Sequence, residues 1–198
     1  MRPRVSLEKN DATQPPLQEA LQAVVEVLER HRISYALTGG LALAQHGVVH
    51  ATQDVDLLLS IPQLKLPRVL DDLRAAGFAF DPMHTIREWT QHHMTQLAWR
   101  GVRVDWLAPV LPAFQDVLKG ATVRDLGGIK VRVVSAEGLI LLKLIAFREQ
   151  DKMDVQGVLT AHAGKLKMGF VMSRLRRIFE PDDPRFAWLE DAMQKFGR

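Results

Sequence analysis

Apolar residues recur every three or four positions in several parts of the chain, which is the pattern of amphipathic helices. In residues 17–32 this spacing leaves the charged side chains on the opposite face. Residues 62–76 show it again, with Pro62 at the start and Gly77 after the end, as helices often have. The pattern also predicts helices at 41–46, 112–119, 135–154, 168–179 and 184–196, and a helix from Asp154 that Gly157 or Gly164 interrupts.

Short apolar or alternating runs separate these helices and predict β-strands. Residues 54–60 contain a run of apolar side chains, Val55 and 57–59, so we expect a strand that is buried on both faces. Residues 102–107 alternate, with Arg103 and Asp105 on one face and three apolar side chains on the other. Further strands are predicted at 34–38, 78–80, 121–126 and 129–134, and the β-rich segments 86–89 and 91–99, with a turn at Arg100-Gly101, predict a hairpin that leads into 102–107.

The order of these elements predicts an α+β fold, in which a small mixed β-sheet flanked by helices is followed by a C-terminal helical region. We place the boundary near residue 134, between a core at 17–134 and the helical region at 135–198. Residues 1–16 are polar and end in two prolines, and we expect them to form a loose arm.

The composition narrows the class of protein. The chain has 198 residues, of which 47% are hydrophobic and 25% charged, as in an ordinary globular protein. Its formal net charge of +3 permits an anionic partner such as a nucleotide without requiring one. No apolar run approaches the roughly 20 residues that span a membrane, and the lack of cysteine excludes disulfides and thiolate metal sites. We therefore expect a cytoplasmic protein with no membrane partner.

Two aspartates stand where the strand 54–60 begins. Asp54 and Asp56 are two residues apart, so their side chains point to the same face. Aspartate is uncommon in strands and costly to bury unless it is paired or bound to a metal, and Mg²⁺ prefers such oxygen ligands. Earlier in the chain, Gly39 and Gly40 lead into a helix start, whose N–H groups suit a phosphate. Nucleotidyl transfer requires both features close together.

This pattern of Gly-Gly, about a dozen residues, and Asp-hydrophobic-Asp-hydrophobic resembles the DNA polymerase β-like nucleotidyltransferase superfamily. Within it, the chain is most similar to the minimal bacterial enzymes of the abortive-infection and type IV toxin–antitoxin group (AbiEii-like). The resemblance implies transfer of a nucleoside monophosphate from an NTP to a hydroxyl acceptor with Mg²⁺, for which Mn²⁺ can substitute. It also implies a toxin that modifies tRNA 3′ ends or a protein hydroxyl and has a cognate antitoxin as a partner.

The superfamily resemblance implies a third acidic residue on a later strand, and Asp105 is the best-placed candidate. In the implied mechanism, Asp54 and Asp56 hold the metals. Asp105 acts as general base on the acceptor hydroxyl and as a further metal ligand. The structural alternative is an ordinary salt bridge between Asp105 and Arg103, which share one face of the strand.

A second match lies in residues 141–154, where Lys143, Arg148, Asp151 and Asp154 resemble a downstream signature of the same group. The resemblance implies that Lys143 binds a nucleotide phosphate and that Asp154 contributes to the nucleotide site. If 135–154 is one helix, Asp151 and Asp154 share a face. The alternative is a helix with ordinary surface ion pairs.

The remaining candidate nucleotide contacts flank the glycines and the acidic pair. Thr38 and Thr52 offer hydroxyl groups. Leu41 follows the glycines where much of the superfamily has Ser, as in the abortive-infection branch. His50 stands where that branch usually has Arg, which makes the expected phosphate-binding charge weaker and dependent on pH.

Two other functions fit the same residues. The first is a nucleotidyltransferase that acts on a small molecule such as an aminoglycoside. The second is a non-catalytic module that keeps the fold and binds a partner. The intact Asp54, Asp56 and Asp105 argue against the second.

Overall fold

The computed structural model describes residues 16–49 and 51–197, so the predicted arm, apart from Pro16, and His50 lie outside the described residues. The helices are α1 (Pro16–Arg30), α2 (Gly39–Gln45), the 3-10 helix η1 (Gln63–Lys65), α3 (Leu66–Ala75), α4 (Pro82–His92), α5 (Pro112–Lys119), α6 (Ala136–Ala146), α7 (Glu149–Ala161), α8 (Met168–Leu175) and α9 (Pro184–Phe196). The strands are β1 (Ser34–Thr38), β2 (Asp54–Ser60), β3 (Phe78–Ala79), β4 (Met94–Trp99), β5 (Val102–Leu107), β6 (Thr122–Leu126) and β7 (Ile129–Val133).

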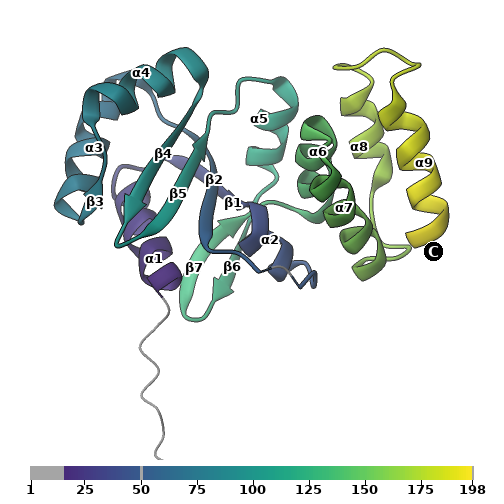
Figure 1. The fold of residues 1–198 in the computed structure, drawn as a ribbon, viewed down its shortest axis with the longest axis horizontal. Helices are drawn as coiled ribbons and strands as arrows, with labels where there is room; N and C mark the ends of the chain where they lie inside the picture. The colour runs from purple at the N-terminus through teal and green to yellow at the C-terminus, as the bar shows by residue number, and fades with distance from the viewer. Residues whose placement is uncertain (1–15, 50, 198) are drawn as a thin grey trace, which may run out of the picture.

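The strands form one mixed sheet with the order β3-β4-β5-β2-β1-β7-β6 (Figure 1). Strand β2 lies at its centre, antiparallel to β1 and parallel to β5. Val55, Leu57 and Leu59 are buried on one face of β2, and Leu58 is buried on the other. The predictions of a mixed sheet and of a strand at 54–60 that is buried on both faces are confirmed.

Some helices pack against the sheet, and others form a helical region beside it. Helix α1 packs against β2 and β5 and contacts α3. Helices α6 to α9 lie together at the end of the molecule that is remote from β3 (Figure 1). Helices α2 and α5 both contact α6, so they join the sheet to this helical region. Within the described ranges, no helix combines the length and apolar character needed to cross a membrane.

One element differs in type from the prediction. Residues 86–89 were expected in a hairpin, but they belong to helix α4. The side chain of Asp81 accepts a hydrogen bond from the backbone N–H of His84 (2.6 Å), and Pro82 occupies the first turn. An N-cap followed by proline is a helix start, and this local signal outweighs the β-rich composition that follows. The hairpin itself is confirmed, but it begins at Met94.

The prediction of a single helix over 135–154 is wrong. Helix α6 ends at Ala146, and Phe147 adopts a left-handed conformation with φ of 56°. Helix α7 then begins, with the carboxylate of Asp151 accepting a hydrogen bond from the backbone N–H of Arg148 (3.1 Å). It continues through Gly157 without interruption.

Arg185 of α9 supports this break between the helices. Its guanidinium lies 4.8 Å from the centre of the Phe147 ring, and its Nε donates to the carbonyl of Leu144 (2.9 Å). The hydrogen bond satisfies one of the carbonyl groups that the end of α6 leaves without a helical partner. The left-handed Phe147, unusual for a residue with a side chain, is thus held by contacts from a distant helix.

His46, which ends α2, ties that helix to β7. Its Nε2 lies 2.8 Å from the carbonyl oxygen of Val134, and its ring meets that of His162 edge-on at 5.4 Å. Burial lowers the pKa of His46 below its usual value, and the electrostatic influence of Arg124 and His162 adds to this, while the Val134 carbonyl and Glu137 oppose it. Folding therefore favours the neutral form of His46.

We expect the stability to fall as the pH drops below about 6.5, the ordinary pKa of an unfolded histidine. In this range the unfolded chain binds more protons at His46 than the folded chain does, so protons favour unfolding. Urea unfolding at pH 7.5 and 5.5 measures the loss, which should be smaller in His46→Asn. An equal loss in both proteins would contradict this assignment.

Candidate active site

The register of two strands brings the three predicted carboxylates to one face of the sheet. In the parallel pair, Asp54 of β2 lies opposite Arg103 of β5, and Asp56 lies opposite Asp105. Side chains directly opposite on paired strands point the same way. Thr38, at the end of β1, lies opposite Asp56 on the other side. The structure therefore brings together Asp54, Asp56, Asp105 and the start of α2.

Gly39 is placed where a side chain would not fit. Its φ is +61°, and a Cβ atom built on it would overlap the carboxylate of Asp56. Glycine is thus required for two reasons, the left-handed backbone and the close approach of α2 to Asp56. Gly40 is buried beside it. Among the predicted hydroxyl residues, Thr38 precedes α2 without capping it by its side chain, and the Thr52 Oγ1 donates to the carbonyl of Asp54 (3.3 Å).

Arg103 spans two of the three carboxylates. Its guanidinium is ion-paired with Asp54, and its Nε lies 3.3 Å from Oδ2 of Asp105. The other oxygen of Asp105 accepts a hydrogen bond from Nε2 of Gln96 (2.8 Å). The salt bridge between Arg103 and Asp105 that the sequence offered as an alternative role is present, and it coexists with the three-carboxylate arrangement.

Asp56 lies in partly buried surroundings beside the other two carboxylates. Burial raises the pKa of the Asp56 carboxyl above its usual value, and the negative charges of Asp105 and Asp54 raise it further. The positive charges of Lys143 and Arg103 oppose this rise without cancelling it. Negative charge is therefore in excess at Asp56.

The predicted residues of the helical region form a second, buried cluster. The Lys143 Nζ lies 3.0 Å from Oδ1 of Asp151 and 2.6 Å from Oδ2 of Asp154. Arg148 adds an ion pair to Asp151 at 2.8 Å, and Gln150 donates to Asp154 at 3.0 Å. The two aspartate side chains are only 2% and 3% exposed. Lys143 thus contacts both aspartates across the break between α6 and α7, although the prediction had placed all three residues on one helix.

Burial alone would raise the pKa of Asp151. The hydrogen bonds from Arg148 and Lys143 outweigh burial, and the pKa of this carboxyl lies below its usual value. Asp151 is therefore ionised, as its role as counterion to Lys143 requires.

The loop after α2 packs closely against helix α7. A Cβ on Gly157 of α7 would come within 2.9 Å of Cγ1 of Val48. The loop that leads to Thr52 and Asp54 therefore rests directly on the backbone of α7, which only a residue without a side chain permits. The charge of Lys143 also acts on Asp56, where it opposes the rise of the pKa.

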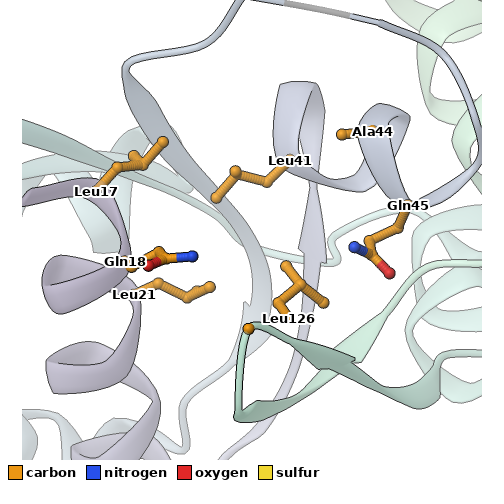
Figure 2. Close-up of a pocket in the computed structure, with 8 residues that line it drawn as sticks. Leu17, Gln18, Leu21, Leu41, Ala44, Gln45 and Leu126 are labelled. Carbon is orange, nitrogen blue, oxygen red and sulfur yellow. The ribbon is translucent and has the colours of Figure 1, made fainter. Parts of the chain in front are cut away.

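Leu41 follows the two glycines in α2. It lines a mainly apolar pocket between α1, α2 and the turn from β6 to β7, beside Leu17 and Leu126 (Figure 2). Leu41 is partly buried and packs against the hydrophobic core.

The residues present fit a divalent cation in their chemistry. Asp54, Asp56 and Asp105 offer carboxylate oxygens, the ligands that Mg²⁺ prefers, and excess negative charge surrounds Asp56. As arranged, the described residues contain no group of three His, Cys, Asp or Glu side chains that could hold a metal ion. Arg103 is ion-paired with two of the three aspartates.

Gln96 is a site residue that the sequence analysis missed. It lies directly opposite Asp105 in the hairpin of β4 and β5. In a hairpin, the turn fixes which residues lie opposite each other. Pairing residues outward from the Arg100-Gly101 turn would therefore have placed Gln96 opposite Asp105. Arg103 was considered as a partner of Asp105 but not of Asp54, since that contact depends on the pairing of β5 with β2.

Two solved structures of ANT(2")-Ia share the fold. ANT(2")-Ia in complex with adenylyl-2"-tobramycin superposes with a TM-score of 0.55 at 10% identity over 82% of this chain and 99% of its own. Its solution structure gives a TM-score of 0.54 at 12% identity, over 90% and 97% of the two chains. An antigenic nucleotidyltransferase-like protein from Paracoccidioides brasiliensis gives 0.47 at 16% identity, over 89% and 93%.

Comparison with curated proteins finds no match to the sequence. Residues 17–181, by contrast, match a family described as "Nucleotidyl transferase of unknown function (DUF2204)". The match takes in β1, α2 and the three aspartates as well as the cluster around Lys143. The chain belongs to this family of nucleotidyl transferases.

Proposed function

We propose that the protein is a Mg²⁺-dependent nucleotidyltransferase that moves a nucleoside monophosphate from an NTP to a hydroxyl acceptor. The observation that carries this proposal is the register of β2 and β5, which aligns Asp56 with Asp105 and leaves Asp54 on the same face. Three carboxylates beside a glycine turn are the donor set that this reaction needs.

Each residue has a role in the proposed reaction. Asp54, Asp56 and Asp105 would hold Mg²⁺, for which Mn²⁺ can substitute. Bound there, the ion supplies the positive charge that stabilises the triphosphate and the departing pyrophosphate. Asp105 also accepts the proton of the acceptor hydroxyl at a carboxylate oxygen, and the hydroxyl oxygen then attacks the α-phosphorus while the bond to pyrophosphate breaks.

The nucleotide would lie between the core and the helical region. Gly39 and Gly40, with the hydroxyl groups of Thr38 and Thr52, form the side of the site that belongs to the sheet. On the other side, Lys143 contacts a phosphate and Asp154 helps to position the lysine, to which it is ion-paired. The contact between Val48 and Gly157 supports this arrangement, since it fixes the two sides against each other.

The acceptor is either a macromolecule or a small molecule. The resemblance to the abortive-infection group favours a cytoplasmic toxin that modifies a tRNA 3′ end or a protein hydroxyl and is held in check by an antitoxin protein. The fold shared with ANT(2")-Ia, whose structure contains adenylyl-2"-tobramycin, favours an aminoglycoside-type acceptor as the second candidate.

The test is a transfer assay with each of the four NTPs labelled at the α-phosphate, with Mg²⁺, and with tRNA, the protein itself or an aminoglycoside as acceptor. We expect one NTP to label one acceptor, and Asp56→Asn to lower the rate at least about a hundredfold, because loss of one carboxylate weakens the hold on the metal. Glu149→Gln, at an exposed ion pair with Lys152, is the matched control. Wild-type transfer by Asp56→Asn would overturn the assignment.

A further inference from the structure

Arg103 holds a position that the proposed reaction does not explain. It lies on β5 two residues before Asp105, and the register of the parallel strands places it opposite Asp54. Because Arg103 and Asp105 alternate onto the same face, the guanidinium lies among the carboxylates of the candidate site. A permanent positive charge thus occupies the face where a metal ion would bind.

The contacts of Arg103 use the oxygens that a cation would need. The guanidinium is paired with Oδ2 of Asp54, and its Nε faces Oδ2 of Asp105. Gln96 occupies Oδ1 of Asp105. Among the described residues, both carboxylate oxygens of Asp56 lack a hydrogen bond or ion pair, while two of the three aspartates are already in contact with the guanidinium.

These contacts are weak enough to be exchanged. The side chains of Arg103, Asp105 and Asp54 are 51%, 36% and 29% exposed. Ion pairs at such exposure stabilise a fold only slightly, in contrast to the buried cluster around Lys143. A divalent cation that carries twice the charge can therefore displace the guanidinium.

We propose that Arg103 is the resident counterion of the carboxylate site, which holds Asp54 and Asp105 in place of a divalent cation and competes with that cation for them. The inference rests on the proposed function, since it takes these aspartates as metal ligands. It explains why the three aspartates are aligned by register and yet do not form a metal-binding group as arranged.

The test is Mn²⁺ binding without nucleotide, measured by electron paramagnetic resonance of the free ion. Arg103→Met should bind Mn²⁺ about three- to tenfold more tightly than the wild type, which is the gain expected when two weak ion pairs no longer oppose binding. Arg103→Lys should fall between the two, because an ammonium keeps the charge but lacks the planar fork.

Arg100→Met is the matched control. Arg100 lies on the turn of the same hairpin, and its ion pair is with Glu19 of α1. Its replacement should leave Mn²⁺ affinity unchanged. Melting temperatures separate competition from a purely structural role. If Arg103 competes with the cation, Arg103→Met should melt below the wild type in EDTA, and Mn²⁺ should raise its melting temperature by more. If Arg103 is only structural, its replacement lowers the melting temperature without changing the affinity for Mn²⁺.

Two outcomes would overturn the proposal, and Asp56→Asn distinguishes them. If the wild type binds Mn²⁺, Asp56→Asn does not, and Arg103→Met binds no more tightly than the wild type, the metal site stands and the role of Arg103 is refuted. If neither the wild type nor Arg103→Met binds Mn²⁺ in a way that depends on Asp56, the metal site of the proposed function fails together with the inference.

Discussion

Gly39→Ala is expected to abolish nucleotidyl transfer and to lower the free energy of unfolding by roughly 2–4 kcal/mol. Two costs add up at this position. An alanine in a left-handed conformation costs about 1–2 kcal/mol, and its methyl group would overlap the carboxylate of Asp56. Relief of that overlap moves either α2 or Asp56, and both belong to the candidate site.

Gly101→Ala separates the two costs. Gly101 also has a positive φ, 85°, but a Cβ there meets no atom within 4 Å. It should therefore show only the backbone cost and keep full activity. Urea unfolding and the transfer assay, applied to both variants, give the comparison. If the two variants lose the same stability and both stay active, the contact between Gly39 and Asp56 has no functional importance.

Lys143→Met is the second substitution with a large expected effect. The ammonium contacts two buried carboxylates, and removal of one partner from a buried ion pair costs about 3–5 kcal/mol. Lys195→Met, at an exposed pair with Asp191, should change the stability by less than about 1 kcal/mol. Thermal or urea unfolding of the two variants measures the difference.

The double variant Lys143→Met with Asp154→Asn tests whether Lys143 also binds the nucleotide. Loss of one carboxylate should recover part of the stability, because less negative charge then lies buried without the ammonium. If Lys143 contacts a phosphate, kcat/KM for the NTP stays low in this more stable protein. Full activity in the double variant would assign Lys143 a structural role only, and a stable Lys143→Met would contradict the ion-pair cluster itself.

The sequence was most informative where local signals and register coincide. The strand at 54–60 and the hairpin strand at 102–107 could be predicted because apolar runs, alternation and a Gly-containing turn define them. Since the strand at 54–60 was correctly predicted, the shared face of Asp54 and Asp56 followed from their spacing. The pairing of Asp56 with Asp105 could be expected only from the resemblance, because a parallel pair is not joined by a turn that fixes its register.

Features that depend on distant contacts could not be predicted. The helix break at Phe147 has no glycine or proline to mark it, and it is held by Arg185 of α9. The link from Arg103 to Asp54 depends on strand pairing. Helix α4 is different, because Asp81 and Pro82 form a helix start that the sequence contains. The β-rich residues that follow them favoured a hairpin instead.

The pairing of β1 with β7 has a consequence for how the protein folds. It joins Leu37 to Val133, about a hundred residues apart, and contacts of such separation form slowly because a long loop must close first. Strand β1 directly precedes the glycine turn, and Lys143 follows β7. During synthesis on the ribosome, the glycine turn and the carboxylates thus emerge long before the lysine that completes the proposed site. We therefore expect the proposed activity to appear only after the helical region has emerged and docked.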